Sequence, residues 1–168
     1  PMIFIPVILI LTSLLLLGSS RLRTVIGIVA IQGLLLGLLP LIAHAHQFNA
    51  SILLVGLSGI VFKGIMLPLL MLKVIKETGI QKDVRPYISY GASLPLGVLL
   101  LAFSAWLTIS LSFPAGSSLL IISTAMFMML SGFLLLIARR LAIMQSLAYL
   151  VLENGIFALG IGISMEIP

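Results

Sequence analysis

Residues 52–76 read ILLVGLSGIVFKGIMLPLLMLKVIK, and this stretch decides the fold. Between Ile52 and Leu72 it contains a single charged side chain, Lys63. An α-helix needs about 20 predominantly apolar residues to cross the hydrocarbon core of a bilayer. Backbone amides in lipid must bond within their own segment, and the stretch lacks the alternation of a β-barrel strand. It therefore predicts a membrane-spanning helix with a lysine near its middle.

The rest of the chain has the same character. Of its 168 residues, 61% are hydrophobic and 8% are charged, whereas soluble domains have roughly 45–50% apolar and about 25% charged residues. A chain this short cannot hide so many apolar side chains from water, because much of its surface stays exposed. A soluble globule and a disordered chain are both excluded. The absence of cysteine excludes disulfides and thiolate-held iron–sulfur clusters in this chain.

Six apolar segments of sufficient length follow one another with short links. We predict an all-α, polytopic membrane protein with six transmembrane helices. Their predicted ranges are Met2–Ser19, Thr24–Ala43, Asn49–Val74, Ser89–Leu111, Ser117–Ala138 and Leu141–Ser164.

The basic residues support this count. Eight of the nine lie in alternate links, which places them on one side of the membrane in a six-pass arrangement. By the positive-inside rule that side is the cytoplasm, so both ends of the chain are expected on the outer side. This topology explains the net charge of +5 without nucleic acid, which we do not expect as a partner. The eight are Arg21, Arg23, Lys73, Lys76, Lys82, Arg85, Arg139 and Arg140.

Lys63 is the ninth basic residue. It precedes Lys73 by ten residues, which corresponds to roughly 15 Å of helix and places it near the middle of the bilayer. A central lysine costs roughly 2.5–3.5 kcal/mol on insertion scales, so it needs a polar partner. Pro68 removes the hydrogen bond to the carbonyl of Gly64 and is expected to break the helix beside the ammonium. Two interpretations stay open: a proton relay, or a fixed ion pair that holds helices together.

Glu153 is a second charge inside a predicted span. It follows Arg140 by thirteen residues, or about 20 Å of helix. Ser146 and Tyr149 share its helical face by their spacing, and neighbouring Asn154 broadens this polar stripe. A carboxylate cannot face lipid, so Glu153 either carries protons or pairs with a lysine of this chain or of a neighbouring subunit.

Other polar residues give weaker signals. Gln32 is expected to form a hydrogen bond between helices, and Gly33 and Gly37 have the spacing of a close helix contact. His44 and His46 do not share a helical face, so we expect no metal site there. Nucleotide-binding, nucleophile and zinc-binding motifs do not occur, which favours a chain without a catalytic centre.

Three segments carry a resemblance to a known family. Residues 52–76 resemble the third helix of the K-type subunit of respiratory complex I and of the C subunit of multi-subunit cation/proton antiporters, with Lys63 where that helix has a buried glutamate. Residues 23–39, RTVIGIVAIQGLLLGLL, are similar to its second helix, whose buried acid falls at or near Gln32. Residues 139–160, RRLAIMQSLAYLVLENGIFALG, are again similar to the second helix and retain the acid as Glu153.

This doubled pattern resembles the hydrogenase-4 component E family, membrane subunits of hydrogenase and formate hydrogenlyase complexes. The resemblance implies a duplicated three-helix unit that lacks its last helix. Residues 1–88 would form the first unit with its cytoplasmic loop. Residues 89–168 would supply a linking helix and the first two helices of the second unit, and a further helix would be expected after residue 168.

The resemblance also implies a function. The chain would be a noncatalytic subunit in the membrane arm of a ferredoxin- or formate-linked hydrogenase of the prokaryotic cytoplasmic membrane, where proton or Na⁺ translocation is coupled to electron transfer. Lys63 and Glu153 would exchange protons. The supporting polar residues would be Gln32, Tyr149, Ser146 and Asn154.

The partners implied are antiporter-like and quinone-site-like membrane subunits, peripheral hydrogenase subunits that hold the nickel–iron and iron–sulfur centres, and lipid. Two alternatives stay open, a purely structural bundle that bridges larger subunits and a subunit of a multi-subunit Na⁺/H⁺ antiporter. A stand-alone transporter is less favoured, because so few polar interior groups make a substrate pocket hard to build.

Overall fold

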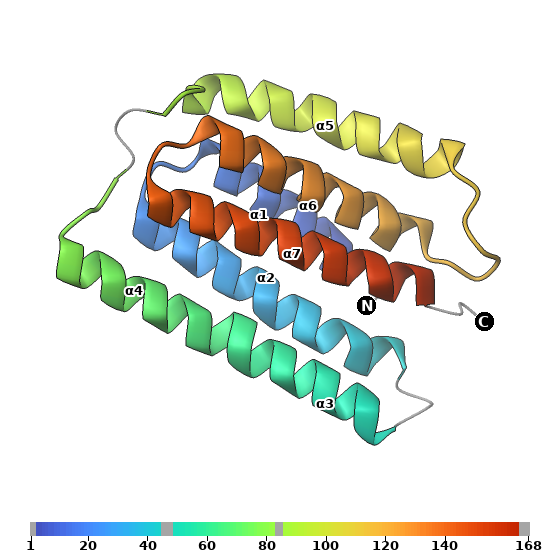
Figure 1. Ribbon diagram of the computed structural model, residues 1–168. Coiled ribbons are helices and arrows are strands. Elements are labelled where there is room, and N and C mark those ends of the chain that lie inside the picture. The colour runs from blue at the N-terminus through green and yellow to red at the C-terminus, as the bar shows by residue number, and fades with distance from the viewer. Residues whose placement is uncertain (1–2, 45–48, 83–85, 165–168) are drawn as a thin grey trace.

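The computed structural model describes residues 3–44, 49–82 and 86–164 (Figure 1). The predicted helix start at Met2 and two polar residues considered above, His46 and Arg85, lie outside the described residues.

The described chain is helical throughout its spans, which confirms the all-α class. Five helices are long and apolar enough to cross a membrane, and α1 is a shorter apolar helix. No strand occurs in the described ranges, where Arg21 and Lys82 form an isolated backbone bridge. These features fit a polytopic membrane protein. The helices are α1 (Phe4–Gly18), α2 (Leu22–Ala43), α3 (Ala50–Gly59), the π-helix η1 (Ile60–Met66), α4 (Leu67–Thr78), α5 (Tyr90–Ser110), α6 (Leu119–Ala138) and α7 (Ala142–Ser164).

The predicted third span, residues 49–74, corresponds to three consecutive elements. α3, η1 and α4 form one continuous rod from Ala50 to Thr78. It extends one turn beyond the predicted end, to the αL residue Gly79. A glycine at this position is a common helix stop, because it adopts positive φ without a steric penalty.

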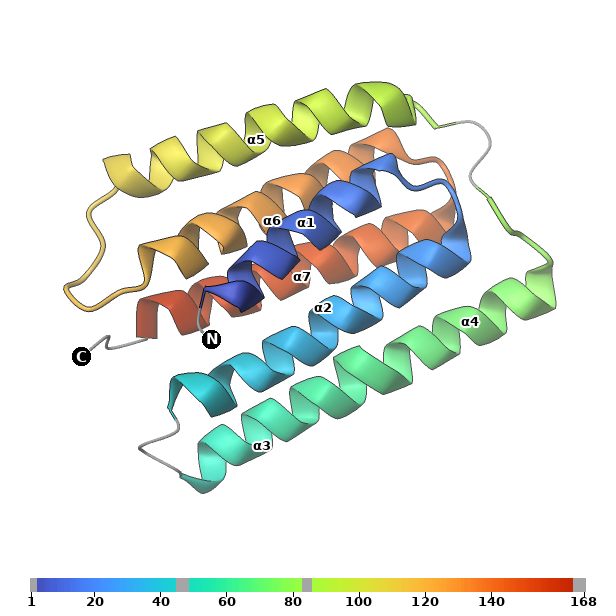
Figure 2. The same cartoon turned by 180° about the vertical axis from the view of Figure 1, so that it is seen from behind.

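Successive rods run in opposite directions (Figures 1 and 2). The links from α1 to α2, α4 to α5 and α6 to α7 all lie at one end of the bundle, which we call the basic end because these links carry the basic residues Arg21, Lys82, Arg139 and Arg140. The start of α1, the end of α7 and the other two links lie at the opposite end. The alternating direction of the rods thus brings the basic links together at one end, as the six-pass prediction requires.

Four helices, α1, α2, α6 and α7, make the core of the bundle, and two rods flank it. α5 packs against α1 and α6, whereas the rod α3–η1–α4 packs on α2 (Figure 2). Both flanking rods are far less buried than the core helices α2, α6 and α7. Large apolar side chains therefore cover the outside of the bundle, as expected when lipid or a protein neighbour surrounds it.

Glycines set the closest helix contacts. A Cβ added at Gly33 would lie 2.6 Å from the carbonyl carbon and oxygen of Lys63, and one at Gly37 would lie 2.7 Å from the nitrogen of Ile60. The predicted close contact at Gly33 and Gly37 is thus confirmed, and its partner is η1. Small residues at such seams let backbones approach and gain dispersion energy in lipid.

Arg139 closes the basic end. It lies in the link where it was expected, but its side chain is 0% exposed. Its guanidinium donates to the carbonyl oxygens of Leu17, at 2.6 Å, and Ile88, at 2.9 Å, and stacks on Tyr90. Counting charges predicts the side of the membrane but not this orientation. The arginine joins the ends of α1, α5 and α6.

Replacing Gly33 by Ala should separate η1 from α2, because the new methyl group meets backbone that cannot move aside. We expect a loss of about 1–3 kcal/mol in unfolding free energy, as for other overpacked cores, measured by SDS-titrated unfolding in mixed micelles. Gly27→Ala is the matched control on the same helix, since nothing lies within 4 Å of its added Cβ. Equal stability of the two variants would contradict the close contact.

Candidate functional site

The two charges inside the predicted spans meet each other. Lys63 Nζ lies 3.2 Å from Glu153 Oε1, which joins η1 to α7. The lysine side chain is 19% exposed and the glutamate side chain is 43% exposed. Of the two possibilities left open for Glu153, pairing within the chain is therefore present. One side of the glutamate remains open to whatever surrounds the bundle.

Lys63 sits in a rare local structure. Seven residues from Ile60 to Met66 form the π-helix, in which the Leu67 N–H bonds to the Phe62 carbonyl five residues earlier. Pro68 follows directly in the same continuous rod, where it has no N–H to donate to the preceding turn. Instead of the break predicted at Gly64 and Pro68, the rod changes from α to π turns and back without interruption. π-Helical turns are frequent at functional sites, since they widen the helix and redirect side chains.

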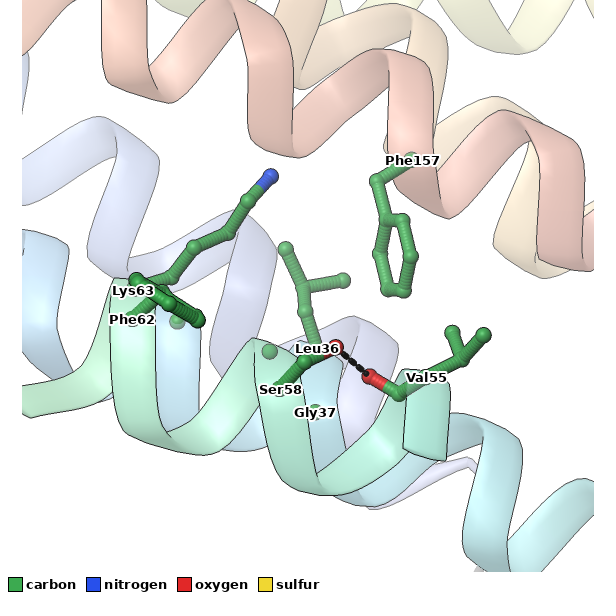
Figure 3. Close-up of a pocket in the computed structure, with 9 residues that line it drawn as sticks. Leu36, Gly37, Val55, Ser58, Phe62, Lys63 and Phe157 are labelled. Atoms are coloured by element: carbon green, nitrogen blue, oxygen red, sulfur yellow. Dashed lines mark hydrogen bonds between the residues drawn. The ribbon is translucent and has the colours of Figure 1, made fainter. Parts of the chain in front are cut away.

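A pocket of about 240 Å³ adjoins the pair, and its walls come from three rods (Figure 3). Lys63 reaches from η1 toward α7, while Phe157 points into the pocket from α7. The ammonium lies 5.2 Å from the centre of the Phe157 ring, within range of a cation–π contact. The lining residues are Gly33, Leu36, Gly37, Val55, Ser58, Gly59, Phe62, Lys63 and Phe157.

A layer of buried polar residues crosses the core at the level of the pair. Each core helix contributes apolar residues to two clusters, one toward the basic end and one toward the other end. Between them each helix carries a buried polar side chain near its middle. We call this set the central polar layer; its members are Thr12, Ser13, Gln32, Ser131 and Asn154. Gln32 directly precedes Gly33, which lies against the backbone of Lys63. Asn154 directly follows Glu153.

Gln32 is the centre of this layer. Its Nε2 donates to Thr12 Oγ1 and Ser13 Oγ, both at 3.1 Å, so the expected bond between helices is present and links α2 to α1. Both hydroxyls donate in turn to the carbonyl oxygen of Leu9. Gln32 Oε1 is buried and accepts no hydrogen bond from the described residues. In those residues no hydrogen bond connects Gln32 directly to Lys63.

The other predicted supporting residues divide into two groups. Ser146 and Tyr149 lie on the exposed surface of α7 toward the basic end, where the tyrosine is 58% exposed and the serine bonds to the carbonyl of Ala142. Together with Met71 of α4 they line a second hollow. Asn154 instead faces the core and is buried. The stripe therefore follows the outer edge of α7, and Asn154 belongs to the central polar layer.

The hydroxyls of the layer are the site residues that sequence reasoning missed. Thr12, Ser13 and Ser131 each lie near the middle of a long apolar segment, and this shared position was the available signal. Among the described residues, no group of three or more His, Asp or Glu side chains is close enough to hold a metal ion. His44 Nδ1 lies 3.3 Å from the carbonyl of Pro40 in its own helix.

The chain is similar to a protein of unknown function. The chain is 24% identical over 163 residues to the uncharacterized protein Rv0085 of Mycobacterium tuberculosis, an alignment that spans 95% of this chain and 74% of the relative. No family model matches the chain, and no solved structure matches it.

A double-mutant cycle tests the ion pair. Lys63→Met and Glu153→Gln should each destabilise the protein, because each leaves a charge or a polar group inside an apolar surround. The double variant should cost less than the sum, with a coupling of about 0.5–3 kcal/mol in unfolding free energy.

The exposed pair Lys73–Glu77, with 3.9 Å between its charged atoms, supplies the matched control cycle. Its coupling should be at most about 0.5 kcal/mol, as is usual for exposed pairs one helical turn apart. Additive effects at Lys63 and Glu153 would show that the two side chains do not interact in the folded protein.

Proposed function

We propose that this chain is a noncatalytic membrane-arm subunit of a complex I-like, ferredoxin- or formate-linked hydrogenase, of the hydrogenase-4 component E type, and that it contributes to proton or Na⁺ translocation. The observation that carries the proposal is the pair Lys63–Glu153, held at 3.2 Å near the middle of two predominantly apolar rods. Intramembrane charges are costly, and where they persist they mark ion pathways and proton relays.

The topology belongs to the same proposal. The chain crosses the prokaryotic cytoplasmic membrane six times, with α1 as the shortest span, the basic end in the cytoplasm and both ends of the described chain outside. The gathering of the basic links at one end supports this orientation. The duplication of a three-helix unit rests on the likeness of residues 23–39 and 139–160 to the same family helix.

The pair has the chemistry of a relay. A proton can pass from the ammonium to the carboxylate across the contact, which leaves two neutral groups that the apolar surround tolerates better than separated charges. Glu153 is the more exposed member and gives access from the open side of α7. Toward the core, the free acceptor of Gln32 and the amide of Asn154 supply hydrogen-bonding groups at the same level.

Redox chemistry is assigned to the partners. Peripheral subunits would hold the nickel–iron and iron–sulfur centres. This chain would contribute to the proton or Na⁺ translocation that is coupled to their electron transfer. Antiporter-like and quinone-site-like membrane subunits would lie beside it.

A neighbouring membrane subunit is expected on the face between η1 and α7. Lipid tails cannot solvate the open side of Glu153, so a protein partner that offers a hydrogen-bond donor satisfies it better. The pocket beside Lys63 and the hollow beside Tyr149 lie along this face and give a partner helix room to pack.

Lys63→Met should abolish ion translocation while the complex still assembles, because the variant keeps the volume and removes the exchangeable charge. The measurement is ion uptake per electron transferred in inverted membrane vesicles that contain the whole complex, with Lys73→Met as a control outside the pair. Normal coupling in Lys63→Met would refute the relay.

The structural alternative gives the opposite result. A lysine fixed between Glu153 and Phe157 could serve only to hold two rods together. In that case Lys63→Met would release subunits from the complex, and the complexes that remain would pump normally. The other alternative, a subunit of a Na⁺/H⁺ antiporter, is tested by copurification in mild detergent. The proteins that copurify with the chain would then be antiporter subunits and not hydrogenase subunits.

A photo-crosslinking amino acid at Tyr149 should capture a neighbouring membrane subunit in native membranes. At Ile109, which is 80% exposed on the opposite flank, the same probe should capture chiefly lipid. Mass spectrometry of the adduct should identify a helix with a donor side chain within one turn of the attachment point, and Glu153→Gln should lower the yield. Lipid adducts alone at Tyr149, or a second copy of this chain, would contradict the proposed interface.

A further inference from the structure

A separate site lies at the basic end, between α2 and α4. A pocket of about 680 Å³ is lined there by four cations, Arg21, Arg23, Lys76 and Lys82, and by no carboxylate among the described residues. Neither the ion pair nor the polar layer uses these side chains. Four like charges around one hollow repel one another, so an anion that enters it is stabilised by all four.

The backbone builds this cluster. Gly79 ends α4 with positive φ and turns the chain back toward α2. The N–H of Leu22 then donates to the carbonyl of Gln81 at 3.1 Å, and the backbones of Arg21 and Lys82 form an antiparallel bridge. This tie holds the cations of two helix ends around the same pocket.

A second, apolar hollow continues from the first. It has a volume of about 540 Å³, shares Arg23 and Lys76 with the basic pocket and has Lys73 at the same cationic end. From these cations it follows α2 and α4 toward the middle of the bundle past Ile26, Gly27, Ala30, Pro68 and Leu72. Gly27 has open space where a side chain would be.

We propose that the two hollows form a binding site for an anionic glycerophospholipid. The basic pocket takes the phosphate headgroup, and the apolar hollow takes an acyl chain. Basic pockets between helices at the cytoplasmic side of a membrane have the charge that binds such headgroups. A free phosphate shares the headgroup chemistry but gains nothing from the apolar hollow, so the continuity of the two favours lipid.

Native mass spectrometry of the purified full chain tests the site. Phosphatidylglycerol, phosphatidylcholine and inorganic phosphate are titrated separately against protein in mild detergent. We expect phosphatidylglycerol to stay bound in preference to phosphatidylcholine. The double variant Arg23→Gln/Lys76→Gln should bind phosphatidylglycerol about 25-fold more weakly, since each basic residue near an anionic lipid contributes about fivefold in affinity. Both side chains are exposed, so the fold should tolerate their loss.

Gly27→Leu separates lipid from free phosphate. The leucine fills the apolar hollow, so it should lower phosphatidylglycerol affinity about tenfold, as expected when a few buried methylene contacts are lost, and leave any phosphate binding unchanged. Arg140→Gln at the same end and Gly160→Leu, where the added Cβ also has open space, are the matched controls and should match the unmodified chain.

Equal retention of phosphatidylglycerol and phosphatidylcholine would overturn the proposal. So would the same loss in Arg140→Gln as in the double variant, or phosphatidylglycerol binding that Gly27→Leu does not change.

Discussion

Hydrocarbon cannot solvate a charge, and the contact between Lys63 and Glu153 is where this constraint acts on the fold. The rod α3–η1–α4 packs on α2 through glycines and contacts little else in the described chain. The ion pair and the contact of Lys63 with the Phe157 ring connect the rod to α7. The backbone of η1 lies against Gly33 at the same residue, Lys63, whose side chain reaches Glu153. Close packing and charge pairing therefore stabilise the same arrangement.

Much of the architecture could be predicted from the sequence, because long apolar runs and basic links report directly on lipid exposure. The helices, the Gly33–Gly37 contact and the bond from Gln32 to another helix follow from such patterns. The pairing of Lys63 with Glu153 does not, because depths counted from Lys73 and from Arg140 differ by roughly 5 Å and ignore the π-helix. The burial of Arg139 could not be predicted either, because the charge pattern indicates the side of the membrane on which a basic residue lies but not the orientation of its side chain. The lipid pocket depends on a backbone tie between Leu22 and Gln81, which no local pattern encodes.

The central polar layer fixes how far each core helix is shifted along its neighbours. Two apolar clusters above and below it would tolerate sliding of one helix along another, because lipid and side chains are equally apolar. The bonds from Gln32 to Thr12 and Ser13 fix α1 against α2 in one register. Gly132 and Gly155 bring α6 and α7 into contact at the same height. The ion pair adds charged groups at this level on α7 and the flanking rod.

The unequal exposure of the pair favours a relay over a permanent clamp. A clamp gains most when both charges are enclosed and all their hydrogen bonds are satisfied, because the attraction is then strongest and desolvation is compensated. Here the lysine is 19% exposed but the glutamate is 43% exposed, so the proposed partner subunit has access to the carboxylate. A donor on that partner would compete with Lys63 for the carboxylate. Movement of the partner could then strengthen or weaken the contact, which would couple a distant reaction to the charge state of this pair.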